Sequence, residues 1–167
     1  MPFADKSLDV VVLFEAIYYL PSADCFAAEC RRVLRPGGYV LITTANKDLY
    51  DFNPSPHSHT YYGVVELNAL FGKYGFSDIK CFGCFPVSNI SWRQKLMRPV
   101  KMIVSRMGLM PKTMAGKKLL KRLVFGKLVP MPAEIREDMA PYVEPGPLPS
   151  DRPDSGHKVI YCAAELL

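Results

Sequence analysis

Two apolar segments that flank one amphipathic segment constrain the fold of this chain most strongly. Residues 8–14 are an almost continuous apolar run rich in valine, and residues 39–44 are apolar and rich in β-branched side chains. Between them Ser22 can cap a helix with apolar positions at helical spacing, and Pro36 with the two glycines after it ends that helix. Such runs are typical of strands covered on both faces of a parallel sheet. The pattern predicts a right-handed β-α-β unit, with residues 8–14 as a central strand, and an α/β fold class.

The next part of the chain predicts a loop, a helix and two further strands. Residues 45–62 are polar, irregular and interrupted by prolines, so they are expected to form a long loop after the second strand. A helix is expected to begin at Gly63 and to stop at Gly75. Residues 77–85 and 158–165 have the composition of strands, and these two strands are candidates to pair as neighbours.

A strongly basic segment separates the last two predicted strands. Residues 85–130 contain eleven Lys and Arg and no Asp or Glu, whereas the rest of the chain has ten basic and sixteen acidic residues. Apolar positions at helical spacing predict amphipathic helices in this segment, and prolines predict extended chain after it. We therefore expect two regions: residues 1–85 with 155–167, and a basic helical and proline-rich insertion over residues 86–154.

The basic amphipathic helices have several interpretations. They can form a solvated lid over a site, or contact an anionic small molecule. Over residues 92–128 they can also attach the protein peripherally to an anionic membrane. Aromatic residues suitable for base stacking are sparse in this segment, which argues against a nucleic-acid partner.

Cysteine usage and the first residues indicate a compartment and argue against a metal site. The five cysteines are odd in number and widely spread, unlike the disulfide frameworks of small secreted domains. The sequence shows neither a secretory leader nor an apolar run of the roughly 18 to 20 residues that span a membrane, so a cytoplasmic location is expected. Cys81 and Cys84 form a CxxC pattern on a predicted strand, whose period of two sends them to opposite faces. No metal site is predicted.

Two sequence blocks resemble one enzyme family. Residues 1–12, MPFADKSLDVVV, are similar to the segment that enters the fourth strand of class I S-adenosylmethionine-dependent methyltransferases of the type 11 kind. Residues 29–42, ECRRVLRPGGYVLI, resemble the helix, the "LRPGG" turn and the fifth strand of that family, and residues 66–76 resemble its next helix. The resemblance implies a partial Rossmann-like methyltransferase sheet, the C-terminal half only, with an α-helical insertion before the last strand.

The resemblance also implies a cofactor and the residues that contact it. The family uses S-adenosylmethionine, and its pattern puts Pro2 and Phe3 near the adenine and Glu15 and Ala16 near the methionine end. The family's glycine-rich loop and the acidic residue that binds the ribose have no counterpart in this sequence. We therefore expect a truncated chain that binds the cofactor weakly by itself. The alternatives are a non-catalytic remnant and a peripheral membrane-binding module.

The acceptor side is predicted from the general rule that open α/β sheets bind ligands beyond the carboxyl ends of their strands. Methyl transfer to a small molecule depends mainly on positioning, and a base is needed only where the nucleophile must lose a proton. A histidine titrates near neutral pH and suits that role, although solvation is the competing explanation for one in a polar loop. Packing competes likewise for Tyr18 and its neighbour. The candidate catalytic residues are His57 and His59, and the candidate substrate residues are Tyr19, Asn46, Tyr50 and Asp51.

Overall fold

The fold is described from a computed structural model of the whole chain. The structure describes residues 1–49, 52–87 and 142–167, together with the single positions 99, 116, 122, 133, 134, 136 and 139. Contacts divide the chain into two compact units, Met1–Val87 with Glu144–Leu167, and Ser88–Val143. The amphipathic helices expected over residues 92–128 fall outside the described residues apart from isolated positions.

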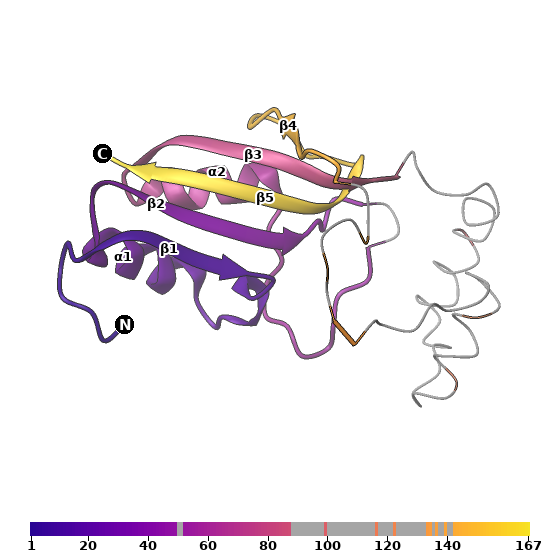
Figure 1. Cartoon of the computed structure of the whole chain (residues 1–167), viewed down its shortest axis with the longest axis horizontal. Coiled ribbons are helices and arrows are strands. Elements are labelled where there is room, and N and C mark those ends of the chain that lie inside the picture. Colours follow the sequence, from indigo (N-terminus) through magenta and orange to yellow (C-terminus); the bar gives the residue numbers. More distant parts are fainter. Residues whose placement is uncertain are drawn as a thin grey trace. The chain divides into compact units, whose positions relative to one another are not determined.

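The first unit is built on a mixed five-stranded sheet with the order β1-β2-β5-β3-β4 (Figure 1). Strands β1 and β2 run parallel, and the three other neighbouring pairs of the described sheet run antiparallel. The neighbouring pair predicted from residues 77–85 and 158–165 is confirmed, and so is the α/β class. The strands are β1 (Leu8–Phe14), β2 (Leu34–Ala45), β3 (Phe76–Pro86), β4 (Gly146–Leu148) and β5 (His157–Leu166).

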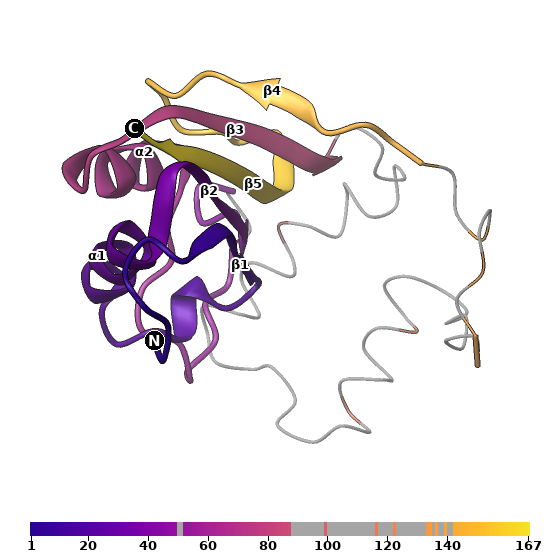
Figure 2. The same ribbon diagram turned by 60° about the vertical axis from the view of Figure 1, so that its left-hand side comes forward.

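Two helices lie on the same face of this sheet (Figures 1 and 2). The first, α1 (Ala23–Val33), begins as predicted, since the Ser22 hydroxyl accepts the Cys25 N–H at 3.2 Å. The second, α2 (Val64–Lys73), begins where the Glu66 carboxylate accepts the Gly63 N–H at 3.1 Å. Gly75 ends it with a φ of 80°, a left-handed conformation that glycine adopts without strain. No helix in the described part of the chain has the length and apolar content that a membrane span requires.

The two faces of the sheet differ in burial. On the side of the helices, alternate residues of β2 and β5 are buried, among them Val40, Ile42, Ile160, Cys162 and Ala164. On the other side no described helix covers the sheet, and alternate side chains of β1 are 47 to 59% exposed, namely Val10, Val12 and Phe14. An apolar hollow of about 370 Å³ lies among strand residues that include Phe14, Leu41, Phe82 and Tyr161. We call this side the open face.

The structure corrects the sequence analysis in three places. Residues 8–14 form an edge strand of the described sheet rather than a central one, because β2 is the only described strand that pairs with β1. Strand β2 begins at Leu34 rather than at residue 39, since Leu34 pairs with Leu8 before a register shift. The left-handed φ of 79° at Gly37 lies within that irregular stretch. The short β4 was not predicted, because its proline is compatible with an edge strand but gives no strand signal.

Candidate functional site

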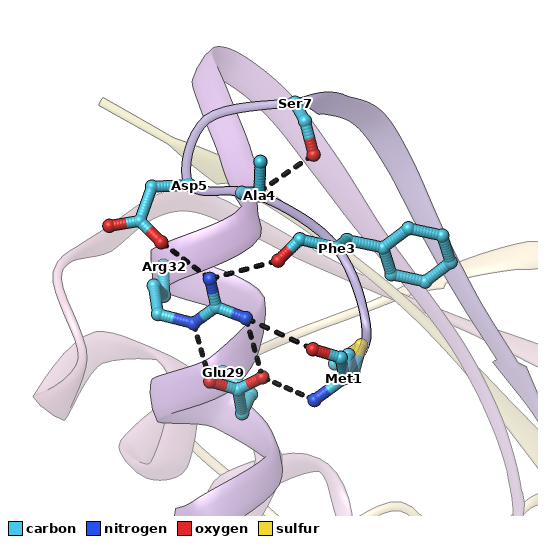
Figure 3. A network of polar contacts seen from close by, with 7 residues as sticks. All are labelled: Met1, Phe3, Ala4, Asp5, Ser7, Glu29 and Arg32. Carbon is cyan, nitrogen blue, oxygen red and sulfur yellow. Dashed lines mark hydrogen bonds and ion pairs between the residues drawn. The ribbon is translucent and has the colours of Figure 1, made fainter.

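The segment that leads into β1 carries Pro2 and Phe3, the two residues expected at the adenine. Both are exposed, and the Phe3 side chain has a relative exposure of 48%. The Arg32 guanidinium on α1 donates to the Phe3 carbonyl at 3.0 Å and forms an ion pair with Asp5, while the Phe3 ring points away from Arg32 (Figure 3). The backbone of this segment is thus fixed on α1, whereas its aromatic side chain is free to meet a ligand.

Glu15 lies at the carboxyl end of β1 in an unusual backbone conformation. Its φ is 50°, in the left-handed region that is costly for residues with a β-carbon. Its N–H donates to the Thr43 carbonyl at 2.9 Å and to the Thr43 hydroxyl at 3.0 Å, so the turn is held against β2. Ala16 follows and begins the 3₁₀ helix η1 (Ile17–Tyr19). Strain of this kind is concentrated at functional sites.

Tyr18 orients the side chain of Glu15. Its hydroxyl donates to the Glu15 carboxylate at 3.0 Å, and its ring is buried. Burial, reinforced by the hydrogen bond and charge of Glu15, raises the pKa of the Tyr18 phenol above its ordinary value. The phenol therefore stays protonated near neutral pH and acts as a hydrogen-bond donor to the carboxylate.

An aromatic cluster joins η1 to the long loop after β2. Tyr18 stacks on Tyr61 with ring centroids 4.6 Å apart, and Phe52 meets Tyr61 edge-on at 4.7 Å. Tyr19 lies edge-on to Tyr18 at 4.6 Å and remains 51% exposed. The His59 N–H donates to the Tyr18 carbonyl at 2.8 Å. The cluster places loop residues and η1 together at the carboxyl end of β1, where an acceptor was expected.

Asn46 is the first residue after β2 and is buried, with 1% exposure. Its Nδ2 donates to the Asp154 and His157 carbonyls at 2.7 and 2.8 Å, and its Oδ1 accepts the Asp48 N–H at 3.0 Å. The amide therefore joins the loop to the start of β5, with its donors and its acceptor already in use. Contact between Asn46 and a substrate stays a prediction.

The structure describes only some of the remaining candidate residues. His57 and His59 are exposed, and neither imidazole hydrogen-bonds a residue that the structure describes, so their role as a general base stays a prediction. Tyr50 and Asp51 lie outside the described residues. Cys81 and Cys84 are both buried, and Cys81 pairs across the strands with Cys162. Within the described ranges no three His, Cys, Asp or Glu side chains gather as a metal site would require.

Three residues of the site were missed by the sequence analysis. Thr43 looks like any β-branched strand residue until the register pairs it with Phe14 and brings it to Glu15. Tyr61 lies in a loop, where no period indicates its stacking partner. Arg32 is near the end of a helix, where a basic residue is expected simply because it suits the helix dipole.

Comparison with known proteins agrees with this geometry. Residues 1–42 match the model of a methyltransferase domain family. The described α/β fold is similar to the Rossmann-like folds of S-adenosylmethionine-dependent methyltransferases. A methyltransferase with that cofactor from Thermotoga maritima aligns with a TM-score of 0.57 at 11% identity, over 100% of this chain and 60% of its own. One from Archaeoglobus fulgidus aligns with a TM-score of 0.52 at 15% identity, over 98% of this chain and 61% of its own.

Curated relatives match the methyltransferase segment at higher identity but over a short length. A probable S-adenosylmethionine-dependent methyltransferase of Mycolicibacterium smegmatis is 36% identical over 89 residues, which are 51% of this chain and 35% of that protein. The fatty-acid O-methyltransferase of the same organism is 49% identical over 45 residues, 27% of this chain and 16% of its own. The matched part of the chain thus spans about a third or less of the length of these relatives.

Proposed function

We propose that this chain carries one side of the cofactor and acceptor site of an S-adenosylmethionine-dependent methyltransferase that acts on a small molecule. One observation carries the proposal. The left-handed turn at Glu15 is held against β2 by Thr43, and its carboxylate is held by Tyr18, at the carboxyl ends of the two parallel strands. Ligands of open α/β sheets bind at this end of the strands.

Two residues that the resemblance assigns to the cofactor suit its chemistry, Phe3 before the amino end of β1 and Glu15 after its carboxyl end. When bound, S-adenosylmethionine supplies a methyl group on a positively charged sulfonium. The exposed Phe3 ring offers an apolar surface on which a flat adenine can stack. The exposed Glu15 carboxylate offers a negative charge on the side of the methionine amino group. The chain's own part in the reaction is therefore to bind and orient the reactants, which can supply most of the rate for an in-line displacement.

Residues outside this chain complete the site in our proposal. No described strand pairs with the outer edge of β1, and the open face exposes apolar side chains that a complete domain buries. The aligned part of this chain also covers about a third of its first curated relative. Further strands, with the glycine-rich loop, would pair along β1, and this chain by itself would bind the cofactor weakly.

A lipid-like small molecule is the acceptor that we favour. Relatives carry the names fatty-acid O-methyltransferase and phthiotriol/phenolphthiotriol dimycocerosates methyltransferase. In this chain the half-exposed Tyr19 and the rings behind it give the loop an aromatic surface that suits an apolar acceptor.

Residues 86–154 are proposed as a separate insertion. Its basic segment over residues 92–128 would favour an anionic group on the acceptor, or an anionic membrane surface. We place the protein in the cytoplasm.

The test is calorimetric titration of S-adenosylmethionine into two proteins. One is this chain of 167 residues. The other, the extended protein, is the longest natural reading frame that contains it. Micromolar binding by the extended protein and much weaker binding by the chain are expected. Binding by neither overturns the proposed function and favours a non-catalytic remnant, whereas micromolar binding by the chain alone overturns the claim that outside residues complete the site.

A matched pair of variants tests the role of Glu15 in the extended protein. Glu15→Gln removes the charge that we assign to cofactor binding, and weakening by roughly tenfold or more is expected for a lost charge-assisted hydrogen bond. Glu165→Gln is the control, because Glu165 also accepts from a tyrosine hydroxyl, Tyr39 at 2.8 Å, but lies at the other end of β2. Equal affinities of the two variants would contradict the assignment.

A further inference from the structure

Residues 1–5, which we call the strap, are attached to α1 mainly by the Arg32 side chain, and the Met1 amino group adds an ion pair with Glu29 at 2.6 Å. The Arg32 guanidinium donates through Nη1 to the Phe3 carbonyl and through Nη2 to the Met1 carbonyl, at 3.0 and 3.2 Å (Figure 3). It also forms an ion pair with Asp5. A guanidinium presents a rigid, planar set of donors, so these three contacts fix the direction of the strap as well as its position.

Arg32 is itself oriented from the other side. The Glu29 carboxylate, one turn earlier on α1, accepts from its Nε at 2.7 Å and from its Nη2 at 3.0 Å. Hydrogen bonds from Arg32 and, in the 167-residue chain, from the Met1 amino group lower the pKa of Glu29 to about 2. The carboxylate is therefore charged at neutral pH and holds the guanidinium in the orientation that reaches the strap.

The next two residues do not depend on the Arg32 side chain. The Lys6 and Ser7 N–H groups donate to the backbone carbonyls of Arg32 and Val33 at 2.9 and 2.8 Å. Strand β1 then begins at Leu8. The Ser7 hydroxyl also donates to the Ala4 carbonyl at 2.7 Å. Loss of the guanidinium should therefore loosen residues 1–5 and leave the strand in place.

The Phe3 side chain has no comparable attachment of its own. It is 48% exposed and is not among the side chains that pack against the hydrophobic core. A ring held only by a mobile backbone loses conformational freedom when it binds a ligand, and that loss weakens binding. The hydrogen bond to its carbonyl is therefore what pre-orders the ring.

We propose that Arg32 is a positioning residue for the cofactor, which acts by holding the strap so that the Phe3 ring lies ready for the adenine. The inference rests on the proposed function, and adds to it a residue that does not touch the cofactor. Arg32 acts through Phe3, so its effect on affinity depends on the ring being present.

Three single variants of the extended protein separate this role from a general effect of charge. Arg32→Met removes the contacts that the guanidinium makes with the strap. Arg32→Lys keeps the charge but not the planar set of donors. Arg35→Met is the control, because Arg35, at the start of β2, also forms an ion pair, to Asp9 at 2.6 Å, and no described contact joins it to the strap. Calorimetry with S-adenosylhomocysteine measures affinity, and nitrogen-15 relaxation of the 167-residue chain measures the mobility of the Phe3, Ala4 and Asp5 amides.

About tenfold weaker binding is expected for Arg32→Met, which corresponds to the cost of ordering one or two side chains and their backbone on binding. Arg32→Lys should recover part of the affinity, and Arg35→Met should bind as the wild type does. The mobility of the Phe3, Ala4 and Asp5 amides should increase in Arg32→Met and stay unchanged in Arg35→Met, with the amides of β1 unaltered in both.

A double-mutant cycle decides whether Arg32 acts through the ring. Phe3→Ala removes the ring and keeps the carbonyl that Arg32 binds, so adding Arg32→Met to it should weaken binding no further. Additive losses would overturn the inference, and so would an Arg32→Met variant that frees the strap and binds as tightly as the wild type. A wild-type extended protein that binds no cofactor overturns the proposed function first, and this inference with it.

Discussion

The helix-covered face and the open face of the sheet differ in how far their side chains are buried. Val11 and Val12 are neighbours on β1, yet Val11 is 9% exposed and Val12 is 52% exposed, because successive side chains point to opposite faces. The covered face is completed by α1 and α2 of this chain. No helix in the described part of the chain covers the open face, where Val10, Val12 and Phe14 are exposed. Burial in the core is therefore confined to one face of this strand.

The largest expected effect is the difference in stability loss between alanine substitutions at two phenylalanines. Phe71 on α2 is fully buried, and Phe71→Ala should lower the free energy of unfolding by about 3–5 kcal/mol through lost burial and a cavity. Phe14 on the open face is 59% exposed, and Phe14→Ala should cost less than about 1 kcal/mol. Urea unfolding of the 167-residue chain measures both. Similar losses for the two variants would break the distinction between the faces.

A second prediction concerns the end of the sheet, where a buried polar residue replaces apolar packing. Asn46→Ala removes the donor to the part-buried carbonyl of His157, so a loss of about 1–3 kcal/mol in unfolding free energy is expected. Asn68→Ala on α2 is the matched control, since Asn68 is only half-buried and should lose under about 0.5 kcal/mol. Thermal unfolding followed by circular dichroism compares them, and equal midpoints would refute the structural role of Asn46.

A third prediction isolates a hydroxyl on the open face. Thr43→Val removes the side-chain acceptor of the Glu15 N–H but keeps the Thr43 carbonyl that accepts the same N–H at 2.9 Å. The expected loss of unfolding free energy is about 0.5–1 kcal/mol, the small end of the range for one hydrogen bond. Chemical-denaturant unfolding gives the value. A loss above about 2 kcal/mol would mean that the hydroxyl, rather than the carbonyl, holds the turn.

The smallest expected effect is the pH dependence that comes from Glu29. Its pKa is lowered to about 2 from an ordinary value of 4.5, so the unfolded chain takes up this proton at a higher pH than the folded one. Its stabilising contribution is complete above about pH 4.5 and is lost as the pH falls toward 2. Glu29→Gln should flatten the decline of stability over that window in acid titrations of unfolding. An unchanged slope would show that the exposed pair contributes nothing measurable.

Local signals in the sequence were enough to predict the helices and strands, but not which residues surround them. The cap at Ser22, the carboxylate of Glu66 and the stop at Gly75 act within one turn of their helices, so the helices could be predicted. The exposure of β1 could not be predicted, because it depends on which elements pair with β1 and cover the open face. Asn46 likewise meets Asp154, a residue 108 positions away, and no periodicity reports a contact at that distance.

The candidate site shows the same division. Resemblance pointed to Phe3 and Glu15, but neither residue's attachment could be inferred from the sequence. Arg32 reaches the Phe3 carbonyl across 29 residues, and Thr43 reaches the Glu15 N–H across 28. Side chains that orient a site from another element leave no pattern in the segment that they orient.

The position of β5 has a consequence for synthesis of the protein. This strand pairs with β2 on one side and β3 on the other, yet it follows every other described element in the sequence. A ribosome therefore delivers the middle of the sheet last, after β2 and β3 have emerged with their inner edges unoccupied. The nascent chain must keep two strand edges apart from other polypeptides until residues 157–166 arrive, and a translation stop before them yields helices with no continuous sheet to pack on.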